Sequence, residues 1–202
     1  MSARYGELSR RITELRNGLL PSKFSPTGLY SDRVYDRTLG FRLLAHAEFE
    51  AFIEDRAYDV ANEAIKAYEA TGRIRPSLLA ISAYSEKVFL GPTSLLRPPQ
   101  KQAPLLIDRA KFARDELTNY IRNMNNGIKE KNLLRILLAV GVESSELDMI
   151  WLNDVETWAT LRGDTAHQSG KVKTRPDPRG EYSRVLSISS GFSDIDKILD
   201  RK

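Results

Sequence analysis

Cysteine is absent from this chain of 202 residues, which excludes disulfide bonds, thiolate metal sites and cysteine nucleophiles. A chain without cysteine also fits a cytoplasmic protein, and we expect that compartment. Histidine is scarce: the two histidines, His46 and His167, stand far apart, and no HExxH pattern accompanies either of them. We therefore expect neither a bound metal ion nor a cofactor.

Long apolar runs are missing too. No stretch reaches the roughly 18 apolar residues that a membrane span needs, and the N-terminal MSARYGELSRR lacks the apolar core of a signal peptide. The sequence holds no glycine-rich phosphate loop, and no nucleophile-elbow pattern supports a Ser-His-Asp site. Strand-like alternation of apolar and polar residues is nearly absent, so the chain is predicted to be all-α. The net charge of +4 is a mild basic excess, compatible with a polyanionic partner.

Helical periodicity is what the sequence does contain. Apolar residues at three- and four-residue spacing predict a first helix over 4–20, which Pro21 ends. A long helix is expected from Asp32 to Ala70, closed by Thr71-Gly72, and its length favours the spine of a bundle. Further helices are predicted over 105–123 and 128–140. Another carries both tryptophans, with Ser144 or Ser145 as its N-cap.

Prolines and basic residues mark two other segments. Five prolines punctuate 72–104, which predicts an irregular insertion with one short helix. Residues 171–202 read as a basic C-terminal segment ending in a short amphipathic helix with Ile195, Ile198 and Leu199. The predicted fold is a single domain over 1–202, an up-and-down helical bundle with a long central helix.

Arg162 is a charged residue at a position where an apolar residue is expected. At roughly 100° per residue, it projects onto the apolar side of its helix. That side is formed by Leu147, Trp151, Val155, Trp158 and Leu161. A cation on such a stripe needs an anion, either a carboxylate or a phosphate, because a buried unpaired charge costs several kcal/mol. Glu50 and Glu54 lie on the apolar side of the long helix and are the candidate carboxylates, unless that helix drifts and both reach water.

His167 follows Arg162 by five positions, a pairing that suits RNA cleavage without metal. Histidine titrates near neutrality and moves protons, while arginine offers a fixed fork of donors to phosphate oxygens. On a regular helix the two side chains point roughly 140° apart. They converge only if the helix breaks near Gly163 or if a second copy supplies the partner set. Alternatively the pair arises by chance, since a lone histidine near a helix end is usually structural.

Four stretches, in order, give the chain a family likeness. Residues 161–170, LRGDTAHQSG, resemble the R-x4-6-H signature of the HEPN superfamily. Supporting stretches are LLAHAEFEAFIED at 43–55, NNGIKEKNLLRILLAVGV at 125–142 and ELDMIWLNDVETWATLRG at 146–163. Together they cover most of the chain and resemble the RiboL-PSP-type and MAE-like HEPN branch.

The resemblance implies a function. Active members are metal-independent endoribonucleases, often toxins or defence effectors, that leave 2′,3′-cyclic phosphate and 5′-hydroxyl ends. They are helical bundles that dimerise, with two signatures meeting in an interface cleft. By position, Arg162 binds the phosphate and His167 transfers a proton. Active members often carry Asn, Asp or His after the arginine, where this chain has Gly163, so Asp164 is assigned the polar role. Glu50 and Lys129 are assigned supporting roles.

Three hypotheses follow from the sequence. The first is a homodimeric HEPN-type ribonuclease that acts on RNA, alone or as a toxin held by a cognate antitoxin. The second is a non-catalytic HEPN module that binds RNA or a protein partner. The third is an unrelated helical adaptor in which Arg162 forms a salt bridge with Glu50 or Glu54.

Overall fold

The computed structural model describes residues 1–84, 106–167 and 175–202, with the backbone alone for 163–167. These residues contain seven α-helices, one 3-10 helix and no strand, which confirms the all-α prediction. The elements are α1 Ala3–Leu19, α2 Asp32–Thr71, α3 Pro76–Ala83, α4 Leu106–Asn123, α5 Glu130–Ala139, the 3-10 helix η1 Ser144–Glu146, α6 Met149–His167 and α7 Pro178–Leu199.

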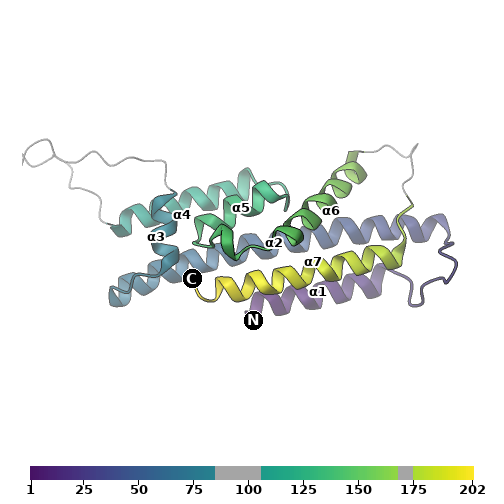
Figure 1. Ribbon diagram of the computed structural model, residues 1–202, viewed down its shortest axis with the longest axis horizontal. Coiled ribbons are helices and arrows are strands. Elements are labelled where there is room, and N and C mark those ends of the chain that lie inside the picture. Colours follow the sequence, from purple (N-terminus) through teal and green to yellow (C-terminus); the bar gives the residue numbers. More distant parts are fainter. Residues whose placement is uncertain (85–105, 168–174) are drawn as a thin grey trace, which may run out of the picture.

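Helix α2 is the spine of the bundle (Figure 1). Its 40 residues span about 60 Å at 1.5 Å per residue. Helices α1 and α7 run along one side of it, and α3, α4, α5 and α6 lie on the other side. The helix ends as predicted at Gly72, whose φ of 71° is left-handed and whose N–H donates to the carbonyl of Tyr68.

Buried apolar side chains from all seven α-helices form one connected core. Of the predicted stripe, Trp151, Val155 and Trp158 are buried on α6, Leu147 is buried just before that helix, and Leu161 is half-buried. In the part of the chain that the structure describes, no helix is both long and apolar enough to cross a bilayer.

Helix α6 begins later than the sequence indicated. Its N-cap is Asp148, whose Oδ1 accepts from the backbone N–H of Ile150 at 2.8 Å and of Trp151 at 3.3 Å. The prediction of Ser144 or Ser145 was wrong, because both lie in η1, where Glu143 and Glu146 form a capping box.

The C-terminal helix is much longer than predicted. Helix α7 has 22 residues, so the expectation of a short helix within 171–202 was wrong. Pro178 reads as a helix breaker, yet it occupies the first turn, where a missing N–H costs nothing. Asp177 caps this turn by accepting from the backbone N–H of Gly180 at 2.7 Å. Within 72–104 the short helix is α3, and residues 85–104 lie outside the described part.

Trp151 joins α6 to α7 through a close contact at Gly191. Its indole Nε1 donates to the carbonyl of Ile188 at 3.1 Å, and its ring lies directly on Gly191. A Cβ atom at position 191 would overlap the ring, so α6 can approach α7 this closely only beside a glycine.

Gly191→Ala should therefore lower the free energy of unfolding by about 1–3 kcal/mol, because the indole must move out of its place. Urea unfolding followed by circular dichroism measures this loss. Gly40→Ala on α2 is the matched control, since a Cβ there meets nothing within 4 Å and alanine favours the helix. Equal stabilities for the two variants would contradict the proposed contact.

Candidate functional site

Four polar residues stand at four-residue intervals along α2: Arg42, His46, Glu50 and Glu54. At this spacing they share one side of the helix. Arg42 and His46 are buried, whereas Glu50 and Glu54 are half-buried. This row faces α6 and the connection between α4 and α5, as its hydrogen bonds and ring contacts show.

The buried end of the row is held by Glu181 of α7, which is only 4% exposed. Its carboxylate accepts from Nε and Nη2 of Arg42 at 2.9 and 2.6 Å and from Nε1 of Trp158 at 2.7 Å. Three helices are thereby linked at one carboxylate. The ion pair and hydrogen bonds offset the cost of burying the two charges.

Arg162 lies one turn beyond Trp158 on α6, half-buried beside the row. It influences both His46 and Glu50 electrostatically. Among the described residues no carboxylate forms an ion pair with it, and its Nε is buried without a hydrogen-bond partner. The salt bridge to Glu50 or Glu54 that the adaptor hypothesis requires is therefore not formed.

His46 is neutral at physiological pH. It is 2% exposed and stacks on Trp158, with ring centroids 5.8 Å apart. Burial, reinforced by the positive charge of Arg162, lowers the pKa of His46 from 6.5 to about 4. Its Nδ1 lies 3.8 Å from Oε2 of Glu50 but makes no hydrogen bond within the described structure. With so low a pKa, this contact is not an ion pair at neutral pH.

Glu50 and Glu54 bind the α4–α5 connection. Nδ2 of Asn125 donates to Oε1 of Glu54 at 2.6 Å and to Oε1 of Glu50 at 3.4 Å. Burial raises the pKa of both carboxyls. The backbone N–H of Gly127 and the charge of Arg162 oppose this rise at Glu50, and the Asn125 amide opposes it at Glu54. Gly127 sits against His46, where an added Cβ would come within 3.3 Å of Cε1.

Helix α6 continues through Gly163 and ends at His167. The break near Gly163, one of the two routes by which Arg162 and His167 converge, is therefore absent from the α6 backbone. The side chains of Asp164 and His167 lie outside the described part. On a continuous helix, positions five apart point roughly 140° away from each other.

The structure brings some of the predicted site residues together and leaves others apart. Arg162 and Glu50 are neighbours, as the electrostatic coupling between them indicates. Lys129 is half-buried just before α5, and its side chain makes no ion pair or hydrogen bond with a described residue.

Sequence reasoning missed Arg42, Trp158 and Glu181 as supports of the site. Arg42 was visible as a cation one turn before His46 on an apolar helix side, the same signal that singled out Arg162. Glu181 lay in a segment read as polar and basic, and nothing in the sequence pairs it with Arg42, 139 positions away.

In the ranges that the structure describes, no three His, Asp or Glu side chains gather to hold a metal ion. The groups that the site offers are a half-buried guanidinium, a neutral imidazole and two carboxyls with raised pKa values. Such a set favours an anionic ligand at the guanidinium.

A family profile identifies the chain. The profile of RiboL-PSP-HEPN matches residues 7–200, which is nearly the whole sequence and includes every helix of the site. The chain belongs to the RiboL-PSP-HEPN family. No curated protein and no solved structure matches it significantly.

Membership in the HEPN superfamily suggests a ribonuclease or a nucleotide-binding module. HEPN domains bind RNA and often form dimers. In this HEPN chain the R-x4-6-H signature occupies the last two turns of α6, directly beyond the Glu181 network.

The lowered pKa of His46 predicts a pH-dependent stability. The unfolded state binds a proton at His46 below pH 6.5 and the folded state only near 4, so stability falls as pH decreases through this window. From pH 7.5 to 5.0 the loss is about 2 kcal/mol. Urea unfolding at both pH values should show that His46→Gln abolishes this part of the loss.

The second histidine supplies the comparison for this experiment. His167→Gln removes the only other histidine of the chain and should leave the pH dependence from His46 in place. If His46→Gln and the unmodified protein lose the same stability between pH 7.5 and 5.0, the imidazole is not buried in its neutral form.

Proposed function

We propose that this HEPN protein is a metal-independent endoribonuclease that leaves 2′,3′-cyclic phosphate and 5′-hydroxyl ends. It would act in the cytoplasm as a homodimer, either alone or as a toxin or defence effector held by a cognate antitoxin. Arg162 binds the scissile phosphate, and His167 transfers a proton. Glu50, Asp164 and Lys129 are assigned supporting roles.

In the reaction, the 2′-oxygen attacks phosphorus while the bond from phosphorus to the 5′-oxygen breaks. The 2′-hydroxyl loses a proton and the leaving 5′-oxygen gains one, so no water is consumed. His167 moves the proton at one of these oxygens. The guanidinium of Arg162 stabilises the negative charge that develops on the phosphoryl oxygens.

The observation that carries the proposal is the state of Arg162. Its guanidinium is half-buried and free of any ion pair with the described residues, and its Nε lacks a hydrogen-bond partner. A partly desolvated cation without a bound carboxylate interacts more strongly with phosphate than an exposed one does. Glu50 lies near enough to interact with it electrostatically but forms no ion pair with it.

The continuous α6 supports a dimeric site. Arg162 and His167 diverge by roughly 140° on one helix, so a single copy does not aim both at one phosphate. Two copies related by a two-fold axis can supply an arginine from one and a histidine from the other.

The alternative is a non-catalytic HEPN module that binds RNA or a protein partner. Its support is Gly163, which stands directly after Arg162 and provides no polar side chain there. Under this hypothesis Arg162 still binds phosphate and no cleavage follows.

The protein should cleave single-stranded RNA in the presence of EDTA. Arg162→Ala should slow cleavage by about 100-fold or more, and His167→Ala by about 10²–10⁴-fold, because each removes a group that acts in the transition state. Cleavage is followed on labelled RNA in denaturing gels, and end chemistry by phosphatase and kinase treatment of the products.

Arg73→Ala is the matched control for Arg162→Ala, since Arg73 is an exposed arginine just beyond α2 at the far end of the bundle. It should cleave at the rate of the unmodified protein. RNA that stays intact but remains bound would favour the non-catalytic module that binds RNA, and absence of RNA binding would favour the module that binds a protein partner.

Mixing the two inactive variants tests the dimeric site. With random exchange of subunits, half of the dimers combine Arg162→Ala with His167→Ala, and each keeps one complete pair from opposite copies. The mixture should recover roughly a quarter of the original rate. No recovery, despite subunit exchange shown by native mass spectrometry, would overturn a site shared between copies.

A further inference from the structure

One end of the bundle concentrates basic side chains. It is formed by the C-terminal part of α1, the connection 20–31, the first turns of α2, and residues 175–179 at the start of α7. We call it the basic end and define it by Arg16, Lys23, Arg33, Arg37, Arg175 and Arg179. Three carboxylates accompany these six cations: Asp32, Asp36 and Asp177.

Few of these cations are paired with carboxylates. Arg16 donates to the carbonyl oxygens of Pro21 and Ser22 at 3.2 and 3.4 Å, and Arg37 donates to the carbonyl oxygen of Gly18. Carbonyl partners hold the guanidinium groups in place but leave their positive charge uncompensated.

Lys23, Arg33 and Arg179 are exposed, and none forms an ion pair with a described residue. Only Arg175 has a carboxylate partner within the described part of this end, Asp32 at 3.0 Å, and both side chains are exposed.

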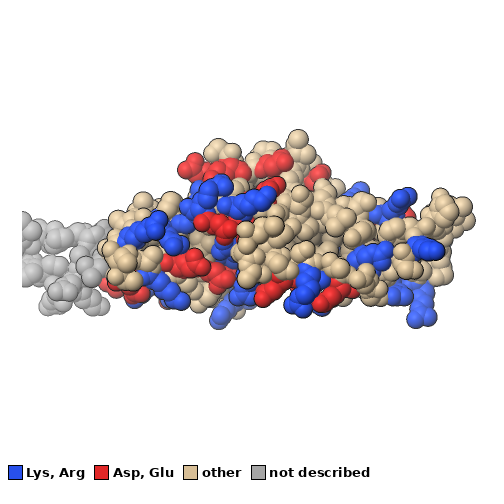
Figure 2. Space-filling view, turned by 90° about the horizontal axis from the view of Figure 1, so that it is seen from below, with Lys and Arg blue, Asp and Glu red and all other residues tan. Residues whose placement is uncertain are grey.

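In the middle of the bundle, by contrast, arginines are paired with carboxylates. There Arg4, Arg11 and Arg56 each pair with carboxylates of neighbouring helices or turns. Figure 2 shows the same contrast, with red and blue side chains interleaved over the middle and mostly blue ones toward the right-hand end. The positive field is therefore concentrated at the basic end.

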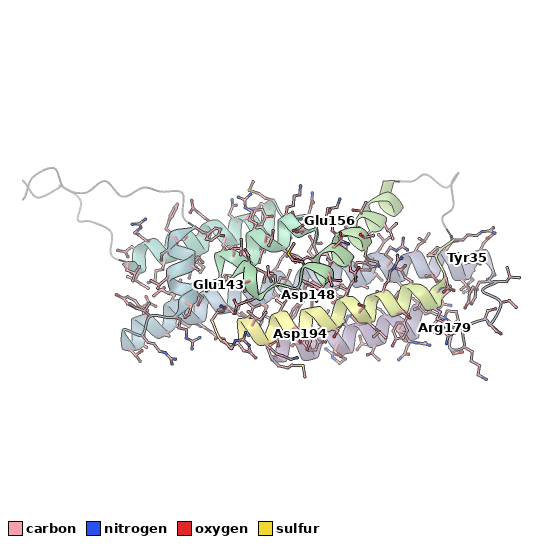
Figure 3. The ribbon with its side chains drawn as sticks, in the orientation of Figure 1. Tyr35, Glu143, Asp148, Glu156, Arg179 and Asp194 are labelled. Carbon is pink, nitrogen blue, oxygen red and sulfur yellow. The ribbon has the colours of Figure 1, made fainter. Side chains whose placement is uncertain are left out.

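Aromatic rings lie among these cations. The guanidinium of Arg175 stands 5.6 Å from the ring centre of Tyr35, which meets Tyr30 edge to face with centroids 5.9 Å apart. Arg16 stands over the rings of Phe24 and Tyr182 at 5.5 and 5.6 Å. Figure 3 shows Tyr35 and Arg179 at the same end of the molecule.

The basic end lies close to the signature along the chain. The C-terminal end of α6 points toward the same end of the bundle as the N-terminal ends of α2 and α7 (Figure 1). His167 and Arg175 are eight positions apart, so their Cα atoms lie within about 28 Å of each other whatever path the chain takes.

We infer that the basic end binds single-stranded RNA and guides it toward Arg162. The cations contact the phosphates and the half-exposed tyrosines stack against bases, a combination typical of surfaces that bind single strands. The end consists of helix termini and a connection, so it offers no continuous amphipathic helix face to lie on a lipid surface. The inference rests on the proposed function for its direction toward Arg162, and the binding itself is separately testable.

The test uses a fluorescent oligouridylate of about 12 nucleotides with 2′-O-methyl riboses, which lack the attacking hydroxyl and are not cleaved. Anisotropy titrations over a range of salt concentrations measure its affinity. The triple variant Lys23→Ala, Arg33→Ala, Arg179→Ala should bind about 10- to 100-fold more weakly. Its plot of log affinity against log salt should be shallower by about 2, because each lost phosphate contact removes about 0.7.

A second triple variant has the same change in charge elsewhere. Lys66→Ala, Arg73→Ala, Lys131→Ala removes three exposed cations from the rest of α2, the turn after it and α5, none ion-paired with a described residue. It should bind nearly as well as the unmodified protein. Equal losses in the two triple variants, or no loss in the first, would overturn the inference.

The stacking contribution has its own variant. Tyr35→Leu should weaken binding by about 5-fold or more with an unchanged salt slope, because stacking involves no counterion release. Tyr35→Phe keeps the ring and should bind normally, even though it loses the hydrogen bond from Tyr35 Oη to the carbonyl of Gly28. If the leucine and phenylalanine variants bind the RNA with equal affinity, Tyr35 does not stack against a base.

Two further outcomes separate this inference from the proposed function. In one outcome, the protein cleaves no RNA, while only the triple variant of the basic end loses affinity for the methylated strand. This result would refute the proposed ribonuclease activity and support RNA binding at the basic end. If the protein does not bind the methylated strand but binds vesicles of phosphatidylcholine and phosphatidylserine, the inference is refuted.

Discussion

A single buried carboxylate, that of Glu181, sets the geometry on which the candidate site depends. It joins Arg42 of α2 and Trp158 of α6 to α7, with all three side chains buried. Removing one partner would leave a charge or a polar group without compensation inside the core, which costs several kcal/mol. The register of α6 against α2 is therefore closely held.

That register decides what lies beside Arg162. His46, one turn after Arg42, stacks on Trp158, and Arg162 is one turn after Trp158, close enough for its charge to act on His46. Burial disfavours the imidazolium of His46, and the positive charge of Arg162 disfavours it further. The outcome is a neutral His46 and an Arg162 whose charge is not neutralised by direct contact with a described carboxylate.

Local patterns predicted much of this molecule. The spine over 32–70, its glycine terminus and the helices with continuous apolar sides followed from periodicity, since each signal lies within one turn of the residues it affects. The helical wheel offered Glu50 or Glu54 as the partner of Arg162. Glu50 lies close enough to interact with Arg162 electrostatically, but no direct salt bridge forms among the described residues. The predictions of capping serines and of a short final helix were wrong, because the pattern did not distinguish Asp148 as an N-cap or Pro178 as the first residue of α7.

The sequence by itself determined the all-α class, the long central helix and the family, because these depend on periodicity and on ordered motifs. Only the tertiary structure decided that Glu181 pairs with Arg42, that Asn125 binds Glu54 and that scattered cations gather at one end of the bundle. These contacts join residues far apart in the chain, and their energies depend on burial. Burial becomes defined only when the helices pack.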